Sequence, residues 1–149
     1  MRQVIYLFLS MGLSIHAIAQ SQQERIITTV NTLFEAMRKA DTVLLKNCFS
    51  PNAVLQTIQD KDGAVKVIGE NLGDFVKFVG QQTQGAADEK IVIESVKIDE
   101  PLAMVWTPYK FYYQGKFSHC GVNCFQLVMI NSEWKIQYII DTRRKDRCL

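Results

Sequence analysis

His119 is the leading candidate for a chemical role. It is the only histidine outside the N-terminal apolar run, which contains His16. An imidazole titrates near neutral pH, so His119 could act as a general base or as a hydrogen-bonding group for a ligand. Asp141 and Arg143 follow near the C-terminus, where an acid could orient the imidazole and a guanidinium could hold an anionic ligand. The alternative makes His119 a polar rim residue, with Asp141 and Arg143 in surface ion pairs.

Three long antiparallel strands within residues 102–143 must position these groups. Tyr113–Lys116 and Ile130–Glu133 have the composition of tight hairpin turns. If both turns are two-residue loops, counting away from them places His119 opposite Lys110. Side chains alternate along a strand, so one face should carry most of the large apolar residues. That expected inner face contains Leu102, Met104, Trp106, Tyr112, Phe117, His119, Asn123, Phe125, Leu127, Met129, Trp134, Ile136, Tyr138 and Ile140.

The expected inner face combines aromatic rings with a few polar groups, which is the usual composition of a small-molecule pocket. Its candidate ligand-binding residues are Trp106, Tyr112, His119, Asn123 and Tyr138, with Arg143 at the end of the last strand. No acidic residue falls on this face of the three strands, and Asp141 reaches it only if a β-bulge near Gly121 turns the strand inward. Aromatic residues also fill closed cores, so a filled interior is an alternative.

Helices and a hairpin precede the long strands. Apolar residues recur at helical spacing from Ser21 to Met37, and Asp41 suits the N-cap of a short helix that follows. A hairpin is expected over residues 53–68, a third helix over 71–80, a loop over 81–88 and a strand over 91–98. The fold class is therefore α+β, with N-terminal helices packed on a strongly curved antiparallel sheet.

Residues 1–19 have the features of a secretory signal peptide, namely a basic start, an apolar run and small residues before a cut after Ala19. The apolar run is too short to cross a bilayer, so we expect no stable membrane anchor. Residues 20–149 then form one domain that is periplasmic or secreted. The formal net charge of +2 gives no indication of a nucleic-acid partner.

Four cysteines remain for an oxidising compartment. Cys120 and Cys124 lie too far apart on one strand to form a disulfide bond. The short C-terminal tail can fold back over Cys120, which favours a Cys120–Cys148 disulfide, and free thiols at both positions are the alternative. The spacing fits no zinc-binding pattern, so no metal or other cofactor is expected.

Several of these segments resemble the nuclear transport factor 2-like superfamily, and within it the small secreted SnoaL-like proteins. They are Phe34–Met37, Asp41, Phe49, Gly115–Gly121 and Trp134–Ile136, and the resemblance extends over about residues 22–143. It implies a cone-shaped domain whose curved sheet and helices enclose a pocket, often with dimerisation through the outer sheet face. Isomerases of the superfamily place a carboxylate base in the cone, which the register above does not supply.

These features predict an exported, non-catalytic domain that binds a small molecule in an aromatic-lined cone. The alternatives are an isomerase, cyclase or dehydratase with His119 as general base and Asp141 or Arg143 as its helper, and a protein-interaction module with a filled cone. A homodimer through the outer sheet face is also expected, because an apolar surface of this kind usually marks a protein contact. The expected surface comprises Val105, Tyr109, Phe111, Val122, Cys124, Val128 and Ile139.

Overall fold

The computed structural model describes residues 22–61 and 63–148, so the expected signal peptide and its cleavage site lie outside the described residues. A first helix spans residues 22–39. The other elements are α2 (Thr42–Asn47), β1 (Phe49–Lys61), β2 (Ala64–Glu70), α3 (Leu72–Gly80), β3 (Ala87–Ile91), β4 (Ser95–Asp99), β5 (Leu102–Tyr113), β6 (Lys116–Ile130) and β7 (Glu133–Thr142). Within the described part of the chain, no helix combines the length and the apolar character that crossing a membrane requires.

The helices form where the sequence predicts them. The first helix buries Ile26, Val30 and Leu33 on one face. Asp41 is the N-cap of α2, where its carboxylate accepts hydrogen bonds from two backbone amides of the first turn. Asn71 caps α3 in the same way. These caps satisfy amide groups that have no partner inside a helix.

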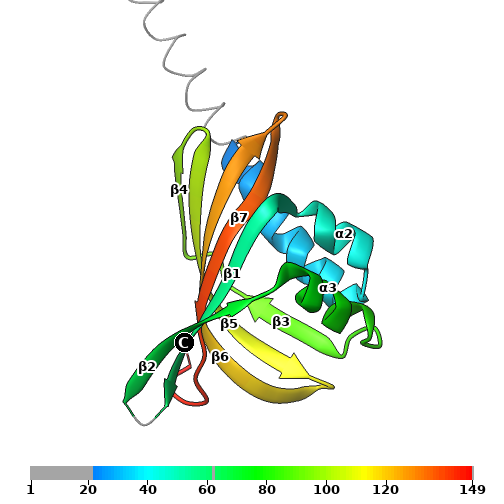
Figure 1. Cartoon of the computed structure of the whole chain (residues 1–149), viewed down its shortest axis with the longest axis vertical. Coiled ribbons are helices and arrows are strands. Elements are labelled where there is room, and N and C mark those ends of the chain that lie inside the picture. The colour runs from blue at the N-terminus through cyan, green and yellow to red at the C-terminus, as the bar shows by residue number, and fades with distance from the viewer. Residues whose placement is uncertain (1–21, 62, 149) are drawn as a thin grey trace, which may run out of the picture.

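The sheet has seven strands in the order β2-β1-β7-β6-β5-β3, with β4 also paired to β5. The sheet is mixed, because β1 runs parallel to β7 while the other pairs are antiparallel. Figure 1 shows the helices together on one side of the strongly curved sheet, with the β1–β2 hairpin extending away from the body. The predicted α+β layering is confirmed.

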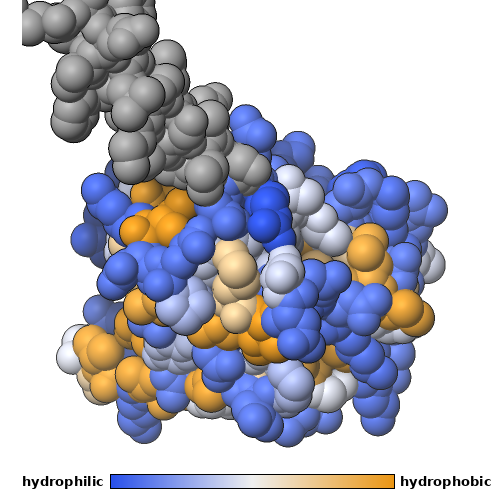
Figure 2. Space-filling model, turned by 90° about the horizontal axis from the view of Figure 1, so that it is seen from above, coloured by the Kyte–Doolittle hydropathy of each residue, from blue (hydrophilic) through white to orange (hydrophobic). Residues whose placement is uncertain are grey.

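The core lies between the helices and the concave face of the sheet. Val105, Phe125, Leu127 and Ile136 are almost completely buried there and pack in one cluster with the first helix. Figure 2 views the molecule from one end, where apolar side chains form separate groups among polar ones. On this face the exposed apolar residues do not form one continuous surface.

The predicted register between β5 and β6 is right only near the turn. Tyr112 pairs with Phe117 as expected, but Phe111 pairs with His119, so Ser118 is an extra residue in β6. This β-bulge reverses the expected faces of β5, because side chains alternate along the strand. The expected inner residues Leu102, Met104, Trp106 and Tyr112 point to the outer face, and Val105, Thr107, Tyr109 and Phe111 face the helices.

A second bulge changes the end of β7. Leu127 pairs with Ile136 as predicted, but Gln126 pairs with Tyr138, so Gln137 is the extra residue. Asp141 consequently lies opposite Asn123 and is buried, whereas Tyr138 and Ile140 move to the outer face. The inward turn of Asp141 was expected only from a bulge near Gly121, and the bulge lies elsewhere.

The segment before the long strands also differs from expectation. The predicted loop over residues 81–88 ends early, because Ala87–Ile91 forms β3 and pairs with β5. The predicted strand over residues 91–98 is interrupted, and β4 starts at Ser95. The new strand β3 adds an acidic residue, Glu89, to the concave face.

Candidate functional site

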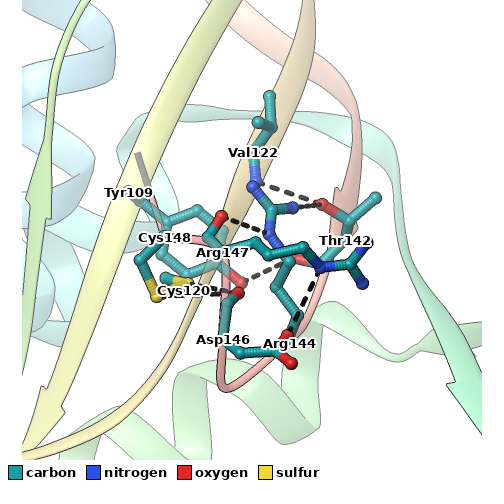
Figure 3. The surroundings of a disulfide bond; sticks show 8 residues. All are labelled: Tyr109, Cys120, Val122, Thr142, Arg144, Asp146, Arg147 and Cys148. Atoms are coloured by element: carbon teal, nitrogen blue, oxygen red, sulfur yellow. Dashed lines mark hydrogen bonds and ion pairs between the residues drawn. A yellow bond between two sulfur atoms is a disulfide. The ribbon is translucent and has the colours of Figure 1, made fainter.

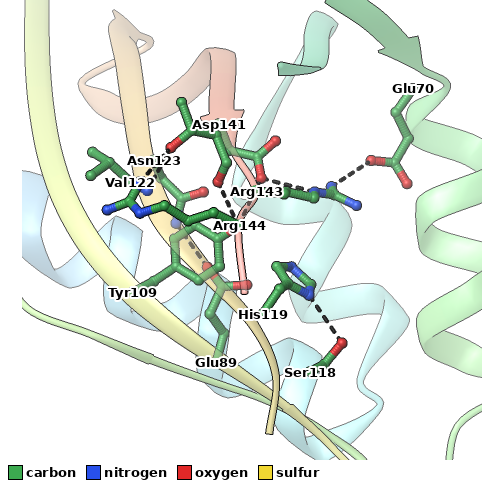
Figure 4. A network of polar contacts seen from close by, with 11 residues as sticks. Glu70, Glu89, Tyr109, Ser118, His119, Val122, Asn123, Asp141, Arg143 and Arg144 are labelled. Carbon is green, nitrogen blue, oxygen red and sulfur yellow. Dashed lines mark hydrogen bonds and ion pairs between the residues drawn. The ribbon is translucent and has the colours of Figure 1, made fainter. Parts of the chain in front are cut away.

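A cavity of about 90 Å³ lies between the helices and the concave face of the sheet. Its apolar wall comes mainly from the helical layer and β1, and its polar wall from β3 and the three long strands. The lining residues are Leu33, Phe34, Met37, Leu55, Gln56, Glu70, Phe75, Glu89, Tyr109, His119, Asn123, Phe125, Ile139, Asp141 and Arg143. Figure 4 shows how the polar members of this set gather around Tyr109 and Asp141.

Glu89 is an acidic residue of the cavity that was not predicted from the sequence. Its Oε1 accepts a hydrogen bond of 2.8 Å from Asn123 Nδ2 (Figure 4). Burial raises the pKa of the Glu89 carboxyl to about 7, the nearby charge of Asp141 adds to this rise, and the Asn123 amide and Arg143 oppose it. A carboxyl group that titrates near neutral pH can both accept and return a proton.

Tyr109 and Asp141 form a second polar pair in the same cavity. The Tyr109 hydroxyl lies 2.9 Å from Asp141 Oδ2 and 2.9 Å from the backbone carbonyl oxygen of Thr142. Burial, followed by the charges of Asp141 and Glu89, raises the pKa of Tyr109 far above its ordinary value. Tyr109 therefore stays protonated and is a hydrogen-bond donor at physiological pH.

Arg143 closes the polar side of the cavity. Its Nε donates a 2.9 Å hydrogen bond to Asp141 Oδ2, and its Nη2 lies 3.8 Å from Glu70 Oε2. Two carboxylates already engage this guanidinium. Arg143 is therefore poorly placed for the expected role of holding an anionic ligand. Arg144 turns away and contacts Thr142 and the carbonyl oxygen of Arg147 instead.

His119 lies in the cavity wall, but Asp141 does not orient it through a hydrogen bond. Its Nδ1 is 3.0 Å from Ser118 Oγ, and its ring packs at centroid distances of 5.7 Å on Tyr109 and 5.1 Å on Phe111. Burial and then the charge of Arg143 hold the pKa of His119 below its ordinary value. The imidazole is therefore neutral at physiological pH.

The cavity contains four of the predicted site residues, His119, Asn123, Asp141 and Arg143. The other three do not line it. Trp106 and Tyr138 point to the outer face because of the two bulges, and Tyr138 donates a hydrogen bond to Gln56 there. Tyr112 packs against Phe117 and under the ammonium group of Lys90 near the hairpin turn.

Glu89 and Tyr109 are among the cavity residues that were not predicted as ligand contacts. The alternation of Ala87, Glu89 and Ile91 is a strand signal that could have indicated an inward Glu89. Tyr109 was assigned to the outer face by the register, and no local feature of β5 reveals the bulge in its partner strand.

The tail after β7 is attached to β6. Cys120 and Cys148 form a disulfide bond with a Cα–Cα distance of 5.7 Å, which is the pairing that the sequence favours (Figure 3). Among the described residues, Cys48 and Cys124 are free thiols. The part of the chain that the structure describes contains no group of three His, Cys, Asp or Glu residues suited to a metal ion.

Larger hollows occur elsewhere on the molecule. One of about 340 Å³ lies beside Arg25, Trp134 and Lys135, between the first helix and the β6–β7 hairpin. It is a surface groove that is more open than the cavity with Glu89. The one lining residue with a strongly shifted pKa is Cys48, where burial raises the pKa of the thiol to about 11. A thiol of that pKa is not a nucleophile at neutral pH. The smaller cavity with Glu89 is therefore the better candidate site.

Comparison with known proteins identifies the fold. No family model and no curated protein matches the sequence. Among solved structures, an NTF2-like protein with a cystatin-like fold from Novosphingobium aromaticivorans superposes with a TM-score of 0.70 at 10% identity, covering 88% of this chain and 87% of that one.

Two further structures agree. An NTF2-like protein of unknown function from Shewanella baltica has a TM-score of 0.66 at 16% identity and covers 85% of this chain and 96% of its own. An NTF2-like protein of unknown function from Silicibacter pomeroyi has a TM-score of 0.65 at 15% identity. The match covers 85% of this chain and 98% of that one. The narrower resemblance to SnoaL-like proteins has no specific support among these structures. The chain has the α+β fold of the nuclear transport factor 2-like proteins.

Proposed function

We propose that this protein binds a compact, partly apolar small molecule in its cone and moves a proton of that molecule. Glu89 is the general base that removes the proton and returns it. The observation that carries the proposal is the Glu89 carboxyl group, which lines the cavity, is held by Asn123 and has a pKa of about 7. The expectation of a non-catalytic binder depended on a cone without an acidic residue. Glu89 and Asp141 remove that premise, so the enzyme alternative is preferred, with Glu89 in place of His119.

The other polar groups have supporting roles in this proposal. If the Ser118 hydroxyl donates to Nδ1 of His119, the imidazole proton is on Nε2 and can stabilise negative charge that develops on a substrate oxygen. A neutral imidazole suits this role because it can donate a hydrogen bond while it keeps its own proton. Tyr109, Asp141 and Arg143 satisfy one another, so they shape the pocket and keep it polar on one side.

The size and walls of the cavity limit the ligand. About 90 Å³ is smaller than the ~150 Å³ cavity that holds benzene. The pocket therefore accepts about four non-hydrogen atoms, or the corresponding end of a larger molecule. Phe34, Met37 and Phe75 suit an apolar part, while Glu89 and His119 lie where a polar part would react. A small ketone or enone has this combination, with an acidic C–H beside a carbonyl oxygen.

Deuterium exchange tests the proposal without knowledge of the natural substrate. Cyclopentanone and 2-cyclopentenone are incubated in D2O with the protein, and loss of the C–H signal next to the carbonyl is followed by NMR. The wild type should accelerate exchange, and Glu89→Gln should reduce the acceleration by about 100-fold or more, since a general base contributes about that much. Glu94→Gln, at an exposed glutamate outside the cavity, is the matched control and should behave as the wild type.

Three results would overturn the proposed chemistry. Exchange that survives in Glu89→Gln would exclude Glu89 as the base. Ketone-dependent NMR shifts at His119 and Asn123 without any exchange would return the protein to the non-catalytic binding class. A cavity that no probe enters would instead favour the interaction module.

The expectations of export and dimerisation also enter as proposals. We infer export from residues 1–19, and N-terminal sequencing of the protein from its host should find a start near Gln20.

We infer a homodimer through the outer sheet face, now with Trp106 and Leu102 as its exposed apolar residues. Both large side chains remain about 40–50% accessible, Trp106 at 40% and Leu102 at 48%.

A further inference from the structure

The last described residues return from β7 to the edge of the site. After Thr142 the chain continues along β6 in the register of β7, and the backbone amide of each of Cys120 and Arg144 donates to the carbonyl of the other, at 2.8 and 2.9 Å. Beyond Arg144 the chain folds back, and the disulfide between Cys120 and Cys148 closes this turn (Figure 3). The tail, defined here as residues 143–148, is thus attached to β6 at both of its ends.

The tail lies directly against the polar side of the cavity. Gly121 allows this close approach, because an added Cβ would lie 1.7 Å from the Thr142 carbonyl oxygen and 2.9 Å from the Tyr109 ring. The same Thr142 oxygen accepts from the Tyr109 hydroxyl, which also contacts Asp141. Thr142 is the last residue of β7, so the tail begins directly beside the contacts of Tyr109 and Asp141.

Apart from the disulfide, little holds the far end of the tail. The Arg144 guanidinium contacts the carbonyl of Arg147, and Arg147 pairs with Asp146, but these contacts are within the tail. The described contact from Asp146 to β6 is with the Cys120 sulfur itself, at 3.8 Å. Without the covalent bond, only the side-chain contacts of Arg143 and the backbone pair between Cys120 and Arg144 would hold the start of the tail, and its far end would be free to fray.

We propose that the Cys120–Cys148 disulfide is a redox-dependent positioning element, so that the polar side of the cavity is fully assembled only in the oxidised protein. The consequence for catalysis rests on the proposed function, whereas the positioning itself does not. The oxidised protein would have Arg143 fixed against Asp141 and Tyr109, and the reduced protein would loosen Arg143 together with the tail. A protein exported to an oxidising compartment would acquire its complete site there.

The redox step is a thiol–disulfide exchange. The thiols of Cys120 and Cys148 together lose two electrons and two protons and form one S–S bond. The electrons go to a disulfide oxidant such as oxidised glutathione, which becomes two thiols. A dithiol reductant reverses the reaction.

His119 reports on this change by NMR, because it is the only histidine after His16. Asp141, Arg143 and Lys145 are the charged groups that act on its imidazole, and burial and the two cations lower its pKa while Asp141 raises it. The protein that starts at Gln20 is titrated while oxidised and again in dithiothreitol. Reduction should raise the His119 midpoint by about half a pH unit or more, since burial and both cations weaken together.

Two variants separate the tail disulfide from other thiol effects. Cys148→Ser should reproduce the His119 midpoint of the reduced protein even without reductant. Cys124→Ser, which removes a free thiol on β6, is the matched control and should keep the oxidised midpoint. The aromatic signals of Trp134, at the other end of the fold, should stay unchanged and show that the core is intact.

The outcomes are distinct from those for the proposed chemistry. An unchanged His119 midpoint and unchanged Tyr109 signals on reduction would overturn the positioning role. Unfolding of the whole chain on reduction, seen as loss of the Trp134 signals, would also overturn it and make the disulfide a general stabilising link. A protein that shows the His119 shift but never exchanges a ketone proton would refute only the proposed chemistry.

Discussion

The side-chain amide of Asn123 donates a 2.8 Å hydrogen bond to Glu89 Oε1 and so joins β6 to β3 across the intervening strand β5. This contact uses the curvature of the sheet, since two strands that are not neighbours bring their side chains together inside the cone. It holds one oxygen of the carboxyl group and fixes its position. The other oxygen is the one that a ligand can approach.

Glu89→Gln should change the pH dependence of stability. The pKa of Glu89 is about 7 in the folded protein and near 4.5 in the unfolded chain. Between these values the folded protein binds the additional proton, so the free energy of unfolding falls as pH rises from about 4.5 to 7. Glutamine has no charge to bury, and the variant should be more stable than the wild type at pH 8, by ~3 kcal/mol at most.

Urea denaturation at pH 4 and at pH 8 measures this effect. The two proteins should have nearly equal stability at pH 4, where Glu89 is protonated in both the folded and the unfolded state. Glu94→Gln provides the exposed control and should show no comparable difference. A Glu89→Gln variant that is less stable at pH 8 would show that the ionised carboxylate is stabilised by its surroundings.

Thr107→Val should stabilise the protein. Thr107 is completely buried beside Asn123, and its Oγ1 has no hydrogen-bond partner among the protein atoms of the described residues. Valine has almost the same shape and removes a buried hydroxyl, so the free energy of unfolding should rise by about 1 kcal/mol. Thr28→Val, at an exposed helical position, should have little effect on the midpoint of thermal unfolding. A clear loss of stability in Thr107→Val would mean that this hydroxyl makes a favourable hydrogen bond.

The fold could be predicted from local patterns, whereas the faces of the long strands could not. A helix cap such as Asp41 depends on neighbouring residues, and the sequence identifies it correctly, as it does the start of α3 near Asn71. Strand pairing holds near each turn for the same reason. One extra residue then exchanges the expected faces: Ser118 in β6 does so for the partner strand β5, and Gln137 does so for the residues of β7 that follow it. Nothing in the local sequence distinguishes these residues as bulges.

The site was therefore predicted only in part. His119 and Asn123 lie on β6, where the strongly apolar Phe125 and Leu127 fix the inward face independently of pairing. Trp106 and Tyr138 were placed by counting across the bulged pairs and were wrong. Glu89 was missed because β3 is short and follows a polar segment. Its role depends on packing against strands that are distant in the sequence, which only the folded structure brings together.

Gly121→Ala should strongly destabilise the protein. The added Cβ would overlap the Thr142 carbonyl oxygen at 1.7 Å, and backbone atoms cannot move aside as the end of a side chain can. Overpacking of this kind typically costs about 1–3 kcal/mol and more where the backbone must shift. Gly69→Ala in β2, where an added Cβ meets no atom within 4 Å, is the matched control and should be nearly neutral in thermal unfolding. Equal melting temperatures for the two variants would contradict the close packing of Thr142 against Gly121 of β6.

Trp106→Lys should dissociate the proposed homodimer. Trp106 pairs with Cys124 and Cys124 with Ile140, so the three side chains share the outer face of the sheet. Trp106 is 40% exposed in the single chain, and a buried tryptophan often contributes much of the binding energy of an interface. Analytical ultracentrifugation should find a dimer for the wild type and at least about a tenfold weaker association for the variant.

Val43→Lys distinguishes loss of this interface from a general effect of added charge. Val43 is 70% exposed on α2, in the helical layer on the opposite side of the sheet, so its replacement should leave the dimer intact. A wild type that sediments as a monomer at high micromolar concentration would refute the dimer. Equal weakening by Val43→Lys and Trp106→Lys would instead place the contact away from the outer sheet face, because only Trp106 belongs to that face.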